Sequence, residues 1–398
     1  MDNNKFEETI LKHAILDHDE FLDKYNPWQT ERGKKVIQNF ADIINGKTPS
    51  DETNEENFSW LAIEEDFENE FLSDKIREFK IPANIDFGLP NHVKGDIDNS
   101  NLFICLTNPN IQVEDKHAVR AHNTTKNYKY FIESLTHYFD IFNSDADVSS
   151  KRENFPSEAE VSKHIIDFNE NILKTEFKSL INANLNGEAA QILQNKTVFA
   201  QHYYYLGKYF YPLFGEYNKE TTFVKLQRKL SERLTNEDVD ELEEKLKNAS
   251  ICNVESFPFR SGNPQLGDGK GNFGRELLSY KNNTILFSAR IILRRIALSL
   301  KENSKEKETP AFIFRRFNRA WKNQIIEVLK KDYEVNNDEI NEYINWLEKY
   351  YFYTFGKRNV NNTSSALISE NIQKQDKPIG KKVKELKYKA NAIIFTKN

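Results

Sequence analysis

Polar residues that could do chemistry stand directly after four apolar stretches of the sequence. The first stretch, residues 102–107, stops abruptly at Asn108-Pro109-Asn110. The other three lead into Arg260-Ser261, into Arg315-Arg316, and into a run that contains Asn361, Asn362 and Ser364. Amides both donate and accept hydrogen bonds, and guanidinium groups bind anions such as phosphate. These four places are therefore the candidate parts of one binding site.

The distribution of charge also favours a phosphate-bearing partner. The chain has 398 residues and a formal net charge of −5, but the charge is uneven. Residues 310–331 carry a net +5 and residues 373–398 a net +6, whereas residues 51–78 carry a net −9. The two basic segments are either a footprint for DNA or RNA or simply solvated helix faces and a tail.

The elements that must position these residues alternate along the second part of the chain. Strands are predicted over 101–107, after 250, over 310–321 and over 350–359, because these segments are apolar and rich in β-branched and aromatic residues. Helical periodicity separates them, notably over 158–182, 283–302 and 322–334.

Such alternation predicts an α/β fold, a three-layer α/β/α arrangement around a short, mostly parallel sheet. Ligands of such sheets bind beyond the carboxyl ends of the strands, where the polar residues stand. Before the sheet, helices are expected between residues 5 and 46 and over 58–79. The expected division is a helical N-terminal region (1–90), an α/β/α domain with helical insertions (91–372) and a Lys-rich tail (373–398).

The four strand ends, taken in order, resemble the uracil-DNA glycosylase-like superfamily, in particular a divergent bacterial branch. They read "LTNPN" (106–110), "VESFPFRSGN" (254–263), "FIFRRFNRAW" (312–321) and "FGKRNVNNTSSALISENI" (355–372). In that superfamily the first motif supplies an Asp or Asn that positions the attacking water, and the closing motif contacts the base. The resemblance implies a DNA glycosylase-like hydrolase that acts on DNA or RNA without a metal or another cofactor.

The resemblance also implies a role for each candidate residue. Asn108 would orient water towards the sugar C1′, and backbone N–H groups after Pro109, beginning with that of Asn110, would contact phosphate or base. The flipped base would stack on Phe257 or Phe259, and its edge would be bound by Asn361, Asn362 and Ser364. The phosphates would be held by Arg260, Ser261, Arg315 and Arg316.

Two departures from the family pattern keep other functions open. Thr107 stands where the first motif usually has a small residue, and the closing motif, with Asn361-Asn362, lacks the usual His. That His stabilises the departing base, so a non-catalytic nucleic-acid or nucleotide-binding sensor in phage defence is one alternative. A protein–protein interaction module is another, using the acidic segment 51–78 and the aromatic patch 201–214.

Composition excludes some further classes of protein. No apolar run reaches the length of a membrane span, and the N-terminus lacks the pattern of a signal peptide. The chain has two cysteines, Cys105 and Cys252, which is too few for a cysteine-based metal site. Both lie in apolar runs and are expected to be buried thiols in a reducing cytoplasm.

Overall fold

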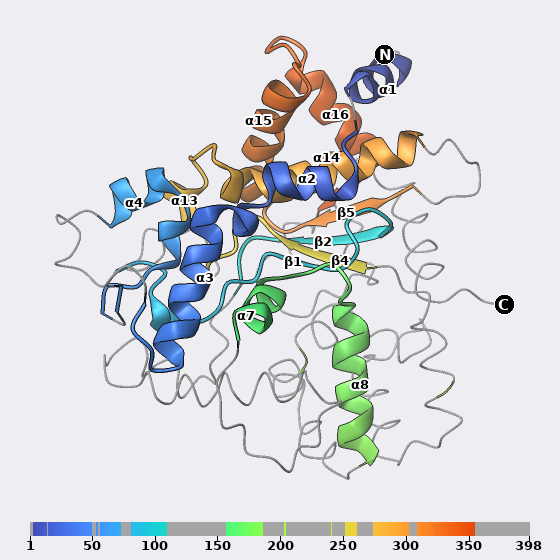
Figure 1. The fold of residues 1–398 in the computed structure, drawn as a ribbon. Helices are drawn as coiled ribbons and strands as arrows, with labels where there is room; N and C mark the ends of the chain where they lie inside the picture. The colour runs from blue at the N-terminus through green and yellow to red at the C-terminus, as the bar shows by residue number, and fades with distance from the viewer. Residues whose placement is uncertain are drawn as a thin grey trace.

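A computed structural model gives the fold shown in Figure 1. It describes residues 3–13, 15–49, 53–54, 56–72, 81–109, 157–185, 203, 240, 251–260, 274–301 and 309–354.

Six short strands form one mixed sheet, in the order β3-β1-β4-β2-β5-β6. The four strands β4, β2, β5 and β6 are parallel to one another, and β1 runs antiparallel to β4 and parallel to β3. The expected α/β class with a mostly parallel sheet is therefore confirmed. The bounds of the strands are β1 Val93–Lys94, β2 Leu102–Leu106, β3 Ile166–Asp167, β4 Ile251–Glu255, β5 Ala311–Phe314 and β6 Phe352–Thr354.

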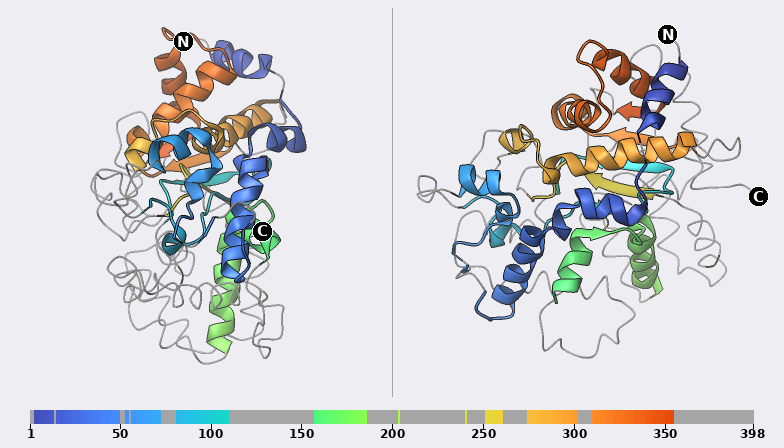
Figure 2. Two further views of the ribbon diagram at one scale, coloured as in Figure 1. Left: turned by 60° about the vertical axis from the view of Figure 1, so that its left-hand side comes forward. Right: turned by 45° about the horizontal axis from the view of Figure 1, so that its top comes forward.

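Helices lie on both sides of this sheet (Figures 1 and 2). The long helix α14 crosses one side, with α15 and α16 beyond it, and α7 and α8 lie on the other side. The bounds of the helices are α1 Asn3–Lys12, α2 His18–Tyr25, η1 Pro27–Gln29, α3 Glu31–Ile44, η2 Trp60–Ile63, α4 Glu65–Phe71, η3 Ile85–Phe87, α7 Glu158–Ile165, α8 Ile172–Leu185, α13 Gly274–Leu277, α14 Asn283–Lys301, η6 Phe317–Trp321, α15 Lys322–Asp332 and α16 Ile340–Tyr350.

The two faces of the sheet differ in chemistry because successive side chains of a strand point to opposite faces. Phe103 and Phe312, whose rings lie 4.7 Å apart, belong to the hydrophobic core that also holds α14. The opposite face carries Asn253 and Glu255 of β4, and both side chains are buried. A polar pair on a buried sheet face is costly unless it has a use or a partner.

The N-terminal helices share this core with the sheet. Phe6 of α1 packs edge-on against Tyr343 of α16, with ring centroids 4.6 Å apart. Arg294 of α14 donates to both carboxylate oxygens of Asp98, at 2.8 and 3.0 Å, and its Nη1 donates to the carbonyl of Leu16. The Arg294 side chain therefore links three segments: α14, the turn that precedes β2 and the chain before α2.

Several predicted elements differ in detail from those observed. Of the helix expected over 58–79, the described part, residues 58–72, is instead the 3₁₀ turn η2 followed by α4. Ser59 caps η2, and Glu64, in an extended conformation, separates the two. The helix expected over 158–182 is interrupted by β3, whose residues pair with β1. The strand expected over 310–321 ends at Phe314 and turns into the π-helix η6.

Two expectations about composition can be compared with the described residues. Both Cys105 and Cys252 are free and fully buried, as expected. No helix among the described residues is long and apolar enough to cross a bilayer. The aromatic patch 201–214, except Tyr203, and the Lys-rich tail 373–398 lie outside the described residues.

A buried histidine predicts how stability depends on pH. Trp28 Nε1 donates to His92 Nδ1 at 3.0 Å, and burial lowers the pKa of His92 to about 3. Below pH 6.5 the unfolded chain takes up a proton at His92 that the folded chain refuses. The free energy of unfolding should therefore fall as pH drops from 6.5 towards 3, by up to about 1.4 kcal/mol per pH unit from this residue.

Urea unfolding at several pH values between 7 and 5 measures this slope. The His92→Gln variant keeps an acceptor for Trp28 but has no titratable group at this position. Its free energy of unfolding should therefore change less with pH, by up to about 1.4 kcal/mol per pH unit. His164, whose pKa burial also lowers, contributes in the same direction in both proteins. Equal slopes in the wild type and the variant would show that His92 is not held neutral.

Candidate functional site at the carboxyl ends of the strands

The connections of the parallel strands diverge between β2 and β5. The chain leaves β2 and returns as β4 on one side, whereas it leaves β5 and returns as β6 on the other. This divergence is a topological switch point, and open α/β sheets bind ligands in the crevice that forms there, outside the carboxyl ends of the strands. Asn108 follows β2 and Arg315 follows β5, so both residues stand at the carboxyl ends of the strands on either side of the switch point.

Backbone contacts join the strand ends into one edge. Ser256 N donates to Leu106 O at 3.0 Å and Phe257 N donates to Thr107 O at 3.3 Å, so the pairing of β4 with β2 continues beyond both strands. On the other side of β2, Arg315 N donates to Cys105 O at 2.8 Å. The three segments that the sequence singled out after β2, β4 and β5 therefore meet, as predicted.

Asn108 is buried and bound to the backbone at this edge. Its Nδ2 donates to Phe259 O at 3.1 Å and to its neighbour Pro109 O at 3.3 Å. These contacts fix the amide plane and use the nitrogen, so Oδ1 is the end of the side chain that is directed away from the two carbonyls. An amide oxygen accepts hydrogen bonds and can orient a water molecule, although it is a poor base.

Arginine charge gathers where β5 ends. Burial, and then the like charges of Arg319 and Arg315, lower the pKa of Arg316. Arg316 has a left-handed backbone, with φ +55°, and η6 begins directly after it. Such backbone strain and π-helical turns both concentrate at functional sites. The residues that bring the charge together are thus held in an unusual conformation.

The candidates in the loop after β4 lie deeper than expected. Phe257 and Phe259 are only 2% and 3% exposed and belong to the hydrophobic core, where Phe259 meets Phe67 edge-on. In this arrangement a base could stack on either ring only after a rearrangement. Arg260 is 7% exposed, and its Nε donates to the carbonyl of Leu89.

Sequence reasoning missed the two polar side chains of β4. Asn253 and Glu255 stand two residues apart and so share one face of the sheet; they are 0% and 1% exposed. Glu255 Oε2 makes no hydrogen bond within the described part of the chain, whereas a hydrogen bond between the Asn253 and Glu255 side chains acts to lower the pKa of the carboxyl group. The signal was present in "ICNVE", where two polar residues alternate with apolar ones.

Burial sets the protonation of Glu255. It raises the pKa of the carboxyl group to about 8, against the neighbouring Asn253 amide and the charges of Arg260 and Arg315, which lower it. The carboxyl group is therefore mostly neutral at pH 7 and does not cancel the arginine charge. Perturbed acids beside a crevice are typical of functional sites.

Other candidates from the sequence lie outside the described residues. These are Asn110, Ser261, Asn361, Asn362 and Ser364. Their predicted roles at the base and the phosphates stay predictions.

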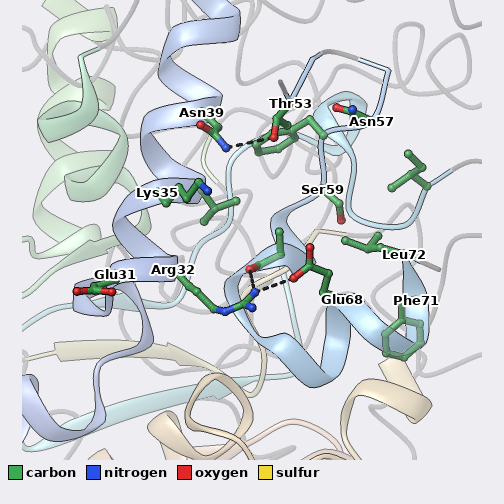
Figure 3. A pocket seen from close by; sticks show the side chains of 14 residues that line it. Glu31, Arg32, Lys35, Asn39, Thr53, Asn57, Ser59, Glu68, Phe71 and Leu72 are labelled. Atoms are coloured by element: carbon green, nitrogen blue, oxygen red, sulfur yellow. Dashed lines mark hydrogen bonds and ion pairs between the residues drawn. The ribbon is translucent and has the colours of Figure 1, made fainter. Parts of the chain in front are cut away.

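A cavity among the described residues lies between α3 and α4 (Figure 3). It measures about 520 Å³. At its rim Arg32 donates to Glu68 at 2.7 Å, and deeper in it Asn39 donates to Thr53 at 3.4 Å. None of the residues that line it belongs to β2, β4 or β5. No cluster of metal-ligating side chains occurs among the residues that the structure describes.

Comparison with known proteins adds no relative to this picture. No protein-family model, no curated protein and no solved structure matches the chain.

Proposed function

We propose that this protein is a uracil-DNA glycosylase-like domain of three-layer α/β/α architecture that binds nucleic acid at the carboxyl ends of β2, β4 and β5. One observation carries the proposal. Backbone and side-chain hydrogen bonds join the segments after β2, β4 and β5, so that Asn108, Arg260 and Arg315 stand at one edge of the sheet. Amides and guanidinium groups are suited to a base edge and to phosphates, respectively.

The proposed chemistry is hydrolysis of an N-glycosidic bond. The nucleotide leaves the stack and its base enters the crevice, a step that costs least for a damaged or mismatched base. Arg315 and Arg316 hold the flanking phosphates. Asn108 Oδ1 accepts a hydrogen bond from the attacking water. Because an amide is a weak base, the reaction depends on a sugar cation that forms as the base departs.

A change at Arg316 tests the binding half of this proposal. Arg316→Gly removes the guanidinium group, and glycine accepts the φ of +55° without strain, so the fold should be kept. DNA affinity should fall at every sequence, and the slope of log K against log salt should shrink by about 1. Arg316→Lys retains the charge and should retain the slope. An unchanged slope in Arg316→Gly would place the DNA elsewhere.

A binder without catalysis is the second candidate, such as a cytoplasmic sensor in phage defence. The contacts of Asn108 favour it, because Nδ2 donates to two backbone carbonyls and the side chain has a structural use without any water. Such a protein would show the same salt-dependent affinity and no base release. A protein–protein interaction module would show neither.

A further inference from the structure

A second cavity lies between the N-terminal helices α1 and α2 on one side and α14 and α15 on the other. It measures about 280 Å³, just below the usual range of small-molecule sites, about 300–1,000 Å³. None of the described residues that line it belongs to a strand, so it is separate from the strand ends of the proposed nucleic-acid site. The apolar part of its wall consists of Ile10, Ile15, Leu16, Phe21, Ala297 and Val328.

Arg290 of α14 lines this cavity and is held in one orientation by its neighbours. Its Nε donates to Asp332 at 2.7 Å, its Nη1 donates to Asn283 at 2.7 Å, and its guanidinium carbon lies 4.1 Å from the centre of the Tyr25 ring. The side chain is only 8% exposed. Nη2 makes no hydrogen bond with the described residues, and it is not among the polar atoms that are closed off from solvent. Its N–H groups are therefore donors left for a ligand in the cavity.

Two tyrosines add hydroxyl groups to the same wall. Tyr25 of α2 and Tyr333, which directly follows α15, both line the cavity and are half-buried. The ring of His13 packs edge-on against Tyr333, with ring centroids 5.5 Å apart. A phenol hydroxyl can donate a hydrogen bond to an anion, so the donors of the cavity come from three different parts of the chain.

The charges around the cavity favour an anion with a single charge. Lys24, Arg290 and Arg294 are the cations in its wall, and Asp332 is the carboxylate. Arg294 is also paired with Asp98 through both carboxylate oxygens, at 2.8 and 3.0 Å. With the histidine in the wall neutral, three positive and two negative charges leave one positive charge in excess. A monoanion balances that charge, whereas a phosphate dianion would leave an uncompensated negative charge.

We infer that this cavity binds a small apolar monocarboxylate. The carboxylate oxygens accept hydrogen bonds from Arg290 Nη2 and from the hydroxyl of Tyr333, because a guanidinium edge matches the planar shape of a carboxylate. The alkyl or aryl part of the ligand lies against the apolar part of the wall, where it is removed from water. This site goes beyond the proposed nucleic-acid function and does not depend on it.

Titration calorimetry of the full chain with benzoate and with hexanoate tests the inference. At least one of the two should bind at a single site with a Kd of about 1 mM or lower. Benzamide, which has the shape of benzoate without its charge, and inorganic phosphate should each bind at least about tenfold more weakly than benzoate. Absence of saturable binding by both carboxylates would overturn the assignment, as would phosphate that binds as tightly as benzoate.

Two variants locate the bound carboxylate. Arg290→Lys keeps a cation beside Asp332 but loses Nη2, and it should raise the Kd of benzoate at least about tenfold. Ala297→Leu extends a side chain into the apolar part of the cavity with every charge kept, so it should abolish binding even if Arg290→Lys fails to fold. Lys330→Gln removes an exposed charge of α15 outside the cavity and should bind benzoate like the wild type. Wild-type affinity in Ala297→Leu would place the carboxylate elsewhere and overturn the assignment.

Discussion

Substituting Gly95 with alanine should destabilise the fold by about 4 kcal/mol, more than an ordinary point mutation does. Gly95 has φ +119°, a conformation that side chains rarely adopt. A Cβ there would lie 2.4 Å from Ile251 O and 2.8 Å from Cys252 Cα. Both are backbone atoms of β4, so relief requires moving the strand that carries Asn253 and Glu255.

Gly46 provides a matched control for this change. It also has a positive φ, +69°, but a Cβ at that position would meet nothing within 4 Å. Gly46→Ala should therefore cost only the conformational strain, about 1 kcal/mol. Urea unfolding of the two variants separates strain from collision. Equal losses of stability would mean that β4 shifts at little cost to make room for a Cβ at residue 95.

Substituting Asn108 with alanine should abolish base release and spare DNA binding. Removal of the group that orients the attacking water should slow release by about 100-fold or more. In the proposed site the phosphate contacts belong to Arg315 and Arg316, so the affinity should stay within a few-fold. A variant that releases base at the wild-type rate would reduce Asn108 to its structural contacts with Phe259 and Pro109.

An aspartate at the same position tests how much the hydrogen bonds of Asn108 to the backbone stabilise the fold. In Asn108→Asp a carboxylate oxygen replaces Nδ2 and faces the carbonyls of Phe259 and Pro109, which accept hydrogen bonds and cannot donate them. This variant should lose stability relative to Asn108→Ala, because a buried carboxylate would be left beside two acceptors. Thermal unfolding of the two variants compares them. Equal stability would mean that the amide does not fasten the loop after β4 to β2.

The main strands were predictable because their burial is visible in the sequence. The run at residues 102–107 marked β2, and the apolar residues after 250 and 310 marked β4 and β5. The two-residue strand β1 was missed because it lies in a turn-rich segment and is defined by its partners, β3 and β4. The antiparallel direction of β1 likewise follows from pairing over a long distance in the sequence.

The site was predictable at its edge but not in its interior. Asn108 and Arg315 follow apolar strands, so sequence alone placed them at the carboxyl ends. Glu255 reads as an ordinary acid in sequence, and only its burial between β2 and the arginines changes its protonation. The bond from Asn108 to Phe259 joins residues 151 positions apart, which no local pattern encodes.

The most direct test of a nucleic-acid site with excision activity is base release by the wild-type protein. Labelled single- and double-stranded DNA carrying uracil, hypoxanthine or normal bases would be incubated with it and then treated with alkali, which cuts at abasic sites. The account predicts cleavage at one kind of base. Binding without cleavage would leave a sensor at the same strand ends. If the protein neither binds nor cleaves the DNA, that result would contradict a nucleic-acid site at these strand ends.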